Sequence, residues 1–162
     1  MDILVISACS GDKRYDDVPI GCETIDSTNR SDLLQAYPNF VAPAAEMYTG
    51  DEHEHVQRAV ANMRKYADVT WKIVSAGYGL VAEDEELVAY DCSFTDIDPV
   101  RDRAKRMGHD PRSLTIDETR RTVGRELNLP NDMKQELASG YDLVFIVLSE
   151  PYLVAVADAL VE

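Results

Sequence analysis

The sequence predicts one α/β domain over residues 1–162, built as a three-layer α/β/α sandwich around a small, mainly parallel sheet. Three segments, residues 3–8, 71–76 and 143–148, are nearly continuous in apolar residues. Such continuity is typical of parallel strands that are covered on both faces. Helical patterns separate the three segments, and this alternation is typical of an α/β sandwich.

Two of the expected helices begin with a capping-box pattern, in which glutamate follows a threonine by three residues. Thr49 and Glu52 predict a helix that runs to about Tyr66. Thr115 and Glu118 predict a second helix, which should end before the next proline along the chain.

The other segments are assigned from their glycines and prolines. Residues 16–47 are expected to form long loops around a short helix near residues 33–37. Residues 132–139 should form a helix that ends at Gly140, because glycine readily adopts the left-handed conformation of a helix end. A last helix should follow Pro151.

The charge of the chain is strongly acidic. Thirty acidic residues face sixteen basic ones, for a formal net charge of −14, and lysine is scarce. Such a surface keeps a protein solvated in concentrated salt, so we interpret the chain as a halophilic protein. No apolar run has the length of a membrane span, and no basic segment precedes an apolar one at the N-terminus. We therefore expect a soluble, cytoplasmic protein with no membrane partner.

The cysteines and histidines indicate neither a disulfide framework nor a metal site. Cys9, Cys22 and Cys92 are odd in number and include no C-x-x-C pair. His53 and His55 lie two positions apart on an expected helix, so they point to different faces and make a poor pair of metal ligands. We expect no metal and no cofactor.

Small, hydroxylated and charged residues follow each predicted strand. Because the carboxyl ends of parallel strands meet at one edge of a sheet, these residues should share one site. They are Cys9, Ser10, Asp12, Lys13 and Tyr15 after the first strand, Ser75, Gly77, Tyr78 and Gly79 at the second, and Ser149 after the third.

Each group has a possible task at such a site. Ser10 and nearby backbone amides suit an anion, and Lys13 suits a phosphate or carboxylate, or acts as a nucleophile if burial lowers its pKa. Asp12 suits a base, and Tyr78 between two glycines suits stacking on a planar ligand. The structural alternatives are that Cys9 and Tyr78 only pack in the core, and that Asp12 and Lys13 only pair in solvent.

Half of the basic residues lie within residues 101–125. An island of positive charge on an acidic chain is a candidate surface for nucleic-acid phosphates. The alternative is a solvated helix face with pairs such as Asp117 with Arg121. The candidate nucleic-acid contacts are Arg101, Arg103, Arg120 and Arg121.

Three motifs, CSGDKRY, MYTG and VSAGYGLVAEDEELVAYD, occur in that order along the chain. The order resembles a group of uncharacterised phage, bacterial and haloarchaeal proteins. It is also similar to the bacterial peroxide-stress family that binds DNA, and to a domain of archaeosine synthase that is related to uracil-DNA glycosylase. The resemblance implies a uracil-DNA-glycosylase-like fold and, together with the acidic charge, an archaeal source.

The resemblance also implies site residues. Ala8 and Arg14 stand where the archaeosine domain has prolines, and no Ser-x-x-His follows Tyr15, so the lysine-transfer reaction of that enzyme is not implied. The matched positions are Cys9, Ser10, Lys13, Tyr15, Tyr48, Thr49, Gly50, Ser75, Gly79 and Asp91.

These observations favour an enzyme that acts on a nucleobase, nucleotide or nucleic acid, by hydrolysing an N-glycosidic bond or modifying the base. Tyr78 would stack on the base, Ser10 and Lys13 would hold phosphate or sugar, and Asp12 or Asp91 would serve as the base. Two alternatives remain: a non-catalytic DNA-binding protein of oxidative stress, and an accessory protein whose site has decayed.

Overall fold

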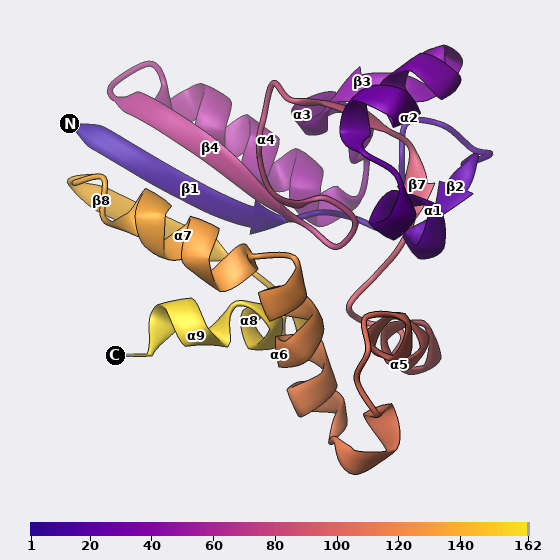
Figure 1. The fold of residues 1–162 in the computed structure, drawn as a ribbon. Helices are drawn as coiled ribbons and strands as arrows, with labels where there is room; N and C mark the ends of the chain where they lie inside the picture. Colours follow the sequence, from indigo (N-terminus) through magenta and orange to yellow (C-terminus); the bar gives the residue numbers. More distant parts are fainter. Residues whose placement is uncertain (162) are drawn as a thin grey trace.

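The computed structural model describes residues 1–161, with a four-stranded sheet at its centre (Figure 1). The strand order is β5-β4-β1-β8, where β5 is Gly79–Ala82, β4 is Asp68–Ser75, β1 is Asp2–Ala8 and β8 is Leu143–Val147. β1 is parallel to both β4 and β8, whereas β5 is antiparallel to β4. The three predicted strands are thus confirmed as parallel neighbours in a small, mainly parallel sheet of an α/β protein.

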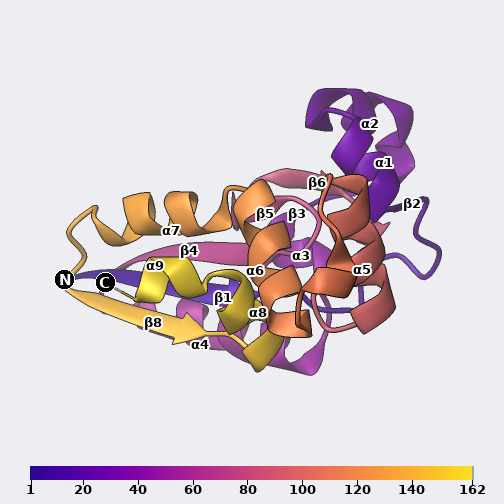
Figure 2. The same cartoon turned by 60° about the horizontal axis from the view of Figure 1, so that its bottom comes forward.

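Helices lie on both faces of this sheet (Figures 1 and 2). Successive strand residues point to opposite faces, and two of them show what covers each face. The ring of Trp71 lies 5.1 Å from His53 of α4 (Asp51–Met63), whereas the amine of Lys72 lies 3.4 Å from a carboxylate oxygen of Glu136 in α7 (Leu129–Leu137). The other helices of the C-terminal half are α5 (Ile97–Arg106), α6 (Ile116–Glu126), α8 (Glu150–Ala155) and α9 (Ala157–Leu160).

Short elements gather beyond the carboxyl end of β1 (Figure 1). The region expected to be mostly loop contains more regular structure than the sequence indicated, because short strands pair with distant partners. The pairs are β2 (Ile20–Gly21) with β7 (Tyr90–Asp91) and β3 (Val41–Pro43) with β6 (Glu86–Val88). The helices here are α1 (Cys22–Ser27), α2 (Arg30–Ala36) and α3 (Ala44–Met47), with a 3-10 turn at Pro38–Phe40 and another, farther along, at Pro111–Ser113.

The helix starts agree with the sequence in one case and differ in another. The Thr115 capping box is confirmed, since Glu118 N donates to the Thr115 hydroxyl (3.2 Å) and Thr115 N donates to the Glu118 carboxylate (2.7 Å). The Thr49 box is wrong: the cap of α4 is Gly50, without a side-chain bond. Thr49 N donates instead to Asp12 O (3.2 Å), which ties it to the N-terminal loop.

β8 is less buried than its apolar sequence predicts. It is an edge strand, and Leu143, Phe145, Ile146 and Val147 are all exposed. By contrast Leu4 and Ile6 of the neighbouring β1 are fully buried. Continuous apolar residues therefore predicted the strand but not its place at the margin of the sheet.

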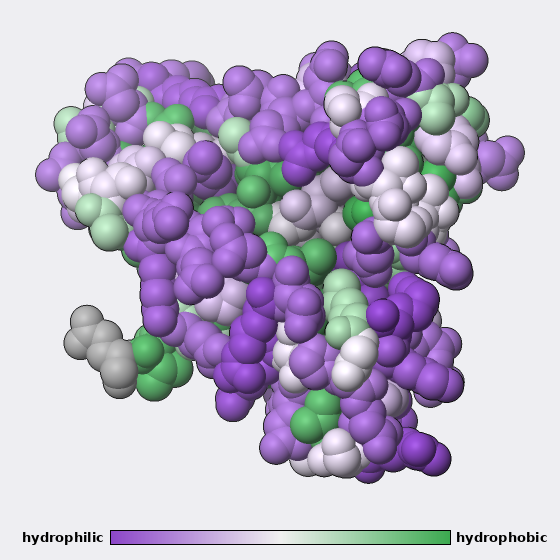
Figure 3. Space-filling model, viewed as in Figure 1, coloured by the Kyte–Doolittle hydropathy of each residue, from purple (hydrophilic) through white to green (hydrophobic). Residues whose placement is uncertain are grey.

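The outer surface is mostly hydrophilic in the view of Figure 3, in keeping with the net charge of −14. Within residues 1–161, no helix combines the length and the apolar character that crossing a membrane would require. Cys22 and Cys92 are joined by a disulfide, so the expectation of no disulfide is wrong. The two lie 70 positions apart, and no spacing motif relates them.

Candidate functional site

The ends of β1 and β4 meet at one edge of the sheet, as expected for parallel strands. Ala8 is level with Val74, and Cys9 N donates to Val74 O (2.9 Å) just beyond the last pair. The loop after β1 and the turn at residues 77–79 therefore start from the same edge. Ser149 follows β8 and caps α8 without a side-chain bond, and it lines neither of the two cavities described next.

A cavity of about 440 Å³, which we call the Lys13 cavity, lies beside the loop after β1. It brings together five of the predicted site residues, Asp12, Lys13, Tyr15, Thr49 and Asp91, and adds Gly11, Asp16, Val18 and Tyr90. Its charged lining is three carboxylates and one amine, and two tyrosines add phenol groups. Two of the added residues could have been predicted from the motifs, because Asp16 directly follows the first motif and Tyr90 lies within the third.

Backbone bonds fix the Lys13 loop against residues 47–49. Lys13 forms an isolated antiparallel bridge with Tyr48, and Arg14 N donates to Met47 O (2.8 Å). The Lys13 amine donates to two carbonyls of its own loop, Ser10 O (2.6 Å) and Gly11 O (3.2 Å). The loop is therefore held in place and is not a free turn.

The surroundings of the Lys13 amine alter its acidity. Burial lowers the pKa of Lys13 because the charged form loses water, although Cys9, Asp91 and Asp12 oppose the shift. The amine also lies 4.7 Å from the ring centre of Tyr90 and 5.5 Å from that of Tyr48, within cation–π range. These ring contacts favour the charged ammonium and, like Cys9, Asp91 and Asp12, oppose the lowering of the pKa of Lys13 by burial.

A buried triad of hydroxyls lies beneath the cavity. Tyr48 donates to Ser75 (3.1 Å), the Tyr48 and Tyr90 hydroxyls are 2.8 Å apart, and those of Ser75 and Tyr90 are 2.7 Å apart. Burial raises the pKa of both tyrosines well above the ordinary value. Tyr48 and Ser75, predicted to bind ligand, are almost fully buried, so their direct role is to hold the Tyr90 ring under Lys13.

Ser10 and Gly50 also act inside the structure. The Ser10 hydroxyl donates to Asp12 O (2.6 Å) and accepts from Gly50 N (3.2 Å). A methyl group at Gly50 would come within 2.8 Å of the Ser10 Cβ, so this close approach requires glycine. The role of Ser10 in binding an anion stays a prediction, and its hydroxyl proton is engaged with the loop backbone.

The predicted stacking platform faces a different cavity. Gly77 and Tyr78 line a hollow of about 550 Å³, the Tyr78 cavity, together with residues of α1, α5 and α6. The Tyr78 hydroxyl donates to Val88 O (2.9 Å), and burial raises the pKa of this tyrosine to about 12. Its ring meets Tyr90 edge-on at 5.1 Å between centres. The single cleft expected from the sequence is therefore two cavities with the Tyr78–Tyr90 contact between them.

The glycines beside Tyr78 serve packing and backbone geometry. A methyl group at Gly77 would come within 2.8 Å of Ile25 and of the Tyr90 ring. Gly79 has φ +84°, which is costly for any residue with a side chain. Cys9 is also part of the core: it is buried, and its sulfur lies 3.2 Å from the Tyr152 hydroxyl.

Two of the four candidate arginines of the basic island, Arg103 and Arg120, are engaged inside the protein. Arg103 is only 2% exposed and binds both carboxylate oxygens of Asp26, at 2.6 and 2.9 Å. The Arg120 side chain is 12% exposed and donates to Phe94 O (2.9 Å). Only Arg101 and Arg121 of the four candidate arginines are exposed. Arg103 follows the buried Val100 by three positions, a helical spacing that was the signal for its burial.

No family model, curated protein or solved structure matches the chain. The motif resemblances therefore remain expectations. Among residues 1–161, no three His, Cys, Asp or Glu side chains are grouped as a metal site would require. The chemistry available at the Lys13 cavity is that of a partly desolvated amine, three carboxylates and the Thr49 hydroxyl.

Proposed function

We propose that the chain is an enzyme that acts on a nucleobase or nucleoside, free or within nucleic acid, and that the Lys13 cavity is its active site. One observation carries the proposal: an amine of lowered pKa lies among carboxylates at the carboxyl edge of a parallel sheet. Ligands of open α/β sheets bind at this edge. Perturbed ionisable groups in a cavity are typical of catalytic sites.

Hydrolysis of an N-glycosidic bond suits these groups best. As the bond to the base breaks, positive charge develops on the sugar, and the carboxylates of Asp12 and Asp91 would stabilise it, as carboxylates do in glycoside hydrolysis. One of the two would take a proton from the attacking water, and the Lys13 ammonium would give a proton to the departing nitrogen. The water oxygen then forms the new bond to the sugar.

The charge of the cavity favours the sugar and base over a phosphate. Asp12, Asp16 and Asp91 outnumber the single amine of Lys13, so a phosphate inside the cavity would meet net negative charge. Carboxylates are good acceptors for ribose hydroxyls. Tyr15, which is half-buried at the wall, is better placed than Tyr78 to contact a base in this cavity.

The resemblance to a domain related to uracil-DNA glycosylase supports the same substrate class, and we include that fold in the proposal. We also include in the proposal that the protein works in a cytoplasm of high salt concentration, so the assays below use concentrated salt. The DNA-binding alternative loses two of its four candidate contacts, because Arg103 and Arg120 are engaged internally, whereas Arg101 and Arg121 stay exposed.

The test is a panel of nucleosides, DNA and tRNA incubated with the protein in concentrated potassium chloride, with release of free base followed by chromatography. We expect turnover that Lys13→Ala reduces by at least about a hundredfold, the contribution of a general acid. Lys65→Ala is the control, because Lys65 is exposed at the end of α4. Absence of turnover with every substrate, or equal loss in both variants, would overturn the proposal.

A further inference from the structure

The Cys22–Cys92 disulfide joins two segments that border both cavities. Cys22 is the first residue of α1, and Cys92 directly follows β7, whose Asp91 lines the Lys13 cavity. Their Cα atoms are 5.2 Å apart. Beside the disulfide, β2 pairs with β7 over only two residues.

The two sulfurs of this disulfide have different surroundings. Cys92 is 7% exposed, and its sulfur lies 3.2 Å from Nη1 of the buried Arg103. Cys22 is half-buried and therefore more accessible. An incoming reagent thus reaches the Cys22 sulfur more easily, and a charge that develops on the Cys92 sulfur meets a guanidinium.

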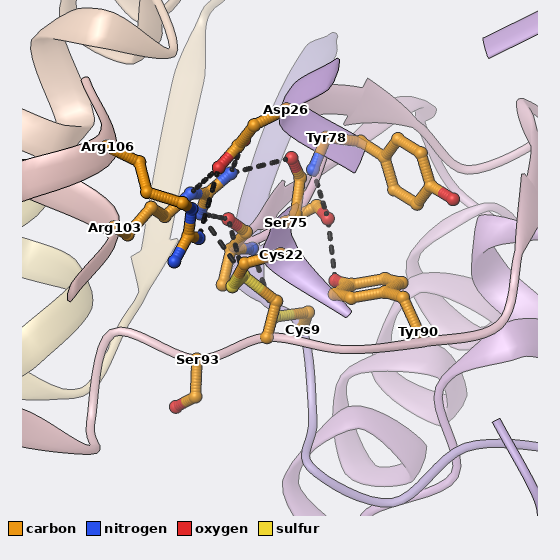
Figure 4. The surroundings of a disulfide bond; sticks show 12 residues. Cys9, Cys22, Asp26, Ser75, Tyr78, Tyr90, Ser93, Arg103 and Arg106 are labelled. Atoms are coloured by element: carbon orange, nitrogen blue, oxygen red, sulfur yellow. Dashed lines mark hydrogen bonds and ion pairs between the residues drawn. A yellow bond between two sulfur atoms is a disulfide. The ribbon is translucent and has the colours of Figure 1, made fainter. Parts of the chain in front are cut away.

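Arg103 and Arg106 lie together with Asp26 beside the disulfide (Figure 4). The Asp26 carboxylate binds Arg103 and also lies 3.7 Å from Arg106. Two guanidiniums therefore share one carboxylate. A neighbouring cation stabilises a thiolate and lowers the pKa of a cysteine.

We propose that Cys22–Cys92 is a reversible thiol–disulfide exchange site that a low-molecular-weight thiol attacks at Cys22. The thiolate of that reagent forms a bond to the Cys22 sulfur, and the bond between the two cysteines breaks with its electron pair leaving on Cys92. Arg103 stabilises the departing thiolate, and a better-stabilised thiolate leaves faster. A second thiol then displaces Cys22, so that two protein thiols form and the reagent becomes a disulfide.

Reduction at this site would remove the covalent link between α1 and β7. The short β2–β7 pairing would remain just before α1, and the Asp26–Arg103 ion pair would still hold α1 to α5. Both cavities lie next to this link, since Asp26 lines the Tyr78 cavity and Asp91 the Lys13 cavity. The exchange site does not depend on the proposed enzymatic reaction.

The first test maps the mixed disulfide in a Cys9→Ser background, which leaves only the two relevant cysteines. The oxidised protein is mixed with reduced glutathione, quenched with N-ethylmaleimide and analysed by peptide mass spectrometry. We expect glutathione on Cys22 and maleimide on Cys92, with at least about tenfold preference over the reverse. Equal labelling, glutathione mainly on Cys92, or the absence of the disulfide from the oxidised protein would each overturn the proposal.

The second test measures the acidity of Cys92 and does not require the mixed disulfide. In the Cys9→Ser, Cys22→Ser protein, the thiolate absorbance near 240 nm reports Cys92 alone. We expect an apparent pKa below about 8.5, the value of an ordinary thiol. A pKa at or above that value would show that burial outweighs the guanidinium, and it would contradict the proposed leaving group. The Cys9→Ser, Cys92→Ser protein, in which Cys22 titrates alone, is the matched control.

Discussion

Ser75→Ala tests whether the buried hydroxyl triad holds the floor of the Lys13 cavity. Ser75 exchanges hydrogen bonds with the hydroxyls of Tyr48 and Tyr90 and accepts one from Tyr78 N at 3.0 Å. Without it, the two tyrosines still bond to each other, but one hydroxyl proton and the Tyr78 N–H lose their partner. A buried donor left unpaired costs about 1–3 kcal/mol, so we expect the free energy of unfolding to fall by about 3 kcal/mol.

The matched control is Ser7→Ala on the neighbouring strand. Ser7 is equally buried but accepts a single bond, from the indole of Trp71 at 2.9 Å. Removing the Ser7 hydroxyl leaves one donor unpaired, so the free energy of unfolding should fall by about half as much as in Ser75→Ala. Urea denaturation of both variants in concentrated salt measures the difference. A cost for Ser75→Ala no greater than that for Ser7→Ala would refute the triad as a supporting network.

Three further outcomes follow from the same structure. Because burial lowers the pKa of Lys13, the unfolded chain binds this proton more tightly than the folded protein does. The free energy of unfolding of wild type, measured relative to Lys13→Met, should therefore rise with pH between the lowered pKa and about pH 10.4. A difference that does not change with pH in urea denaturation would contradict the burial of the amine. The methyl group of Gly124→Ala would overlap a backbone carbonyl of α8, so this variant should lose about 3 kcal/mol or more of the free energy of unfolding. The methyl group of Gly11→Ala meets open space, so that variant should lose little. Thermal unfolding measures both. Tyr15→Phe loses a 2.7 Å bond to a backbone carbonyl and should cost about 1 kcal/mol by urea denaturation; no loss would argue against that bond.

Local sequence patterns predicted the elements well where one physical signal dominates. The continuous apolar segments predicted the three parallel strands, and the Thr115 capping box predicted the start of α6. Both features are set by residues that are close together in the sequence. The exposed position of β8 was not predictable in the same way. An apolar sequence indicates a strand that can be buried on both faces. Whether that strand lies at the centre or at the edge of the sheet depends on the strand order, which the local sequence does not specify.

The site was predicted in part for a similar reason. Strand direction placed Lys13 and Tyr78 at one edge, as expected. The path of the chain through β6 and β7 then inserts Tyr90 between them, and no local pattern encodes that path. The Cys22–Cys92 bond was missed because it depends on the same long-range arrangement.

The most direct test of the Lys13 cavity as the active site is a backbone amide NMR titration of the protein in concentrated salt. Adding an unphosphorylated nucleoside that the panel identifies as a substrate should shift the amides of Lys13, Thr49 and Asp91 together. Matched addition of its 5′-monophosphate should shift them less, because the carboxylates repel the phosphate. Shifts confined to the Tyr78 cavity, or none at saturating nucleoside, would contradict the assignment of the active site.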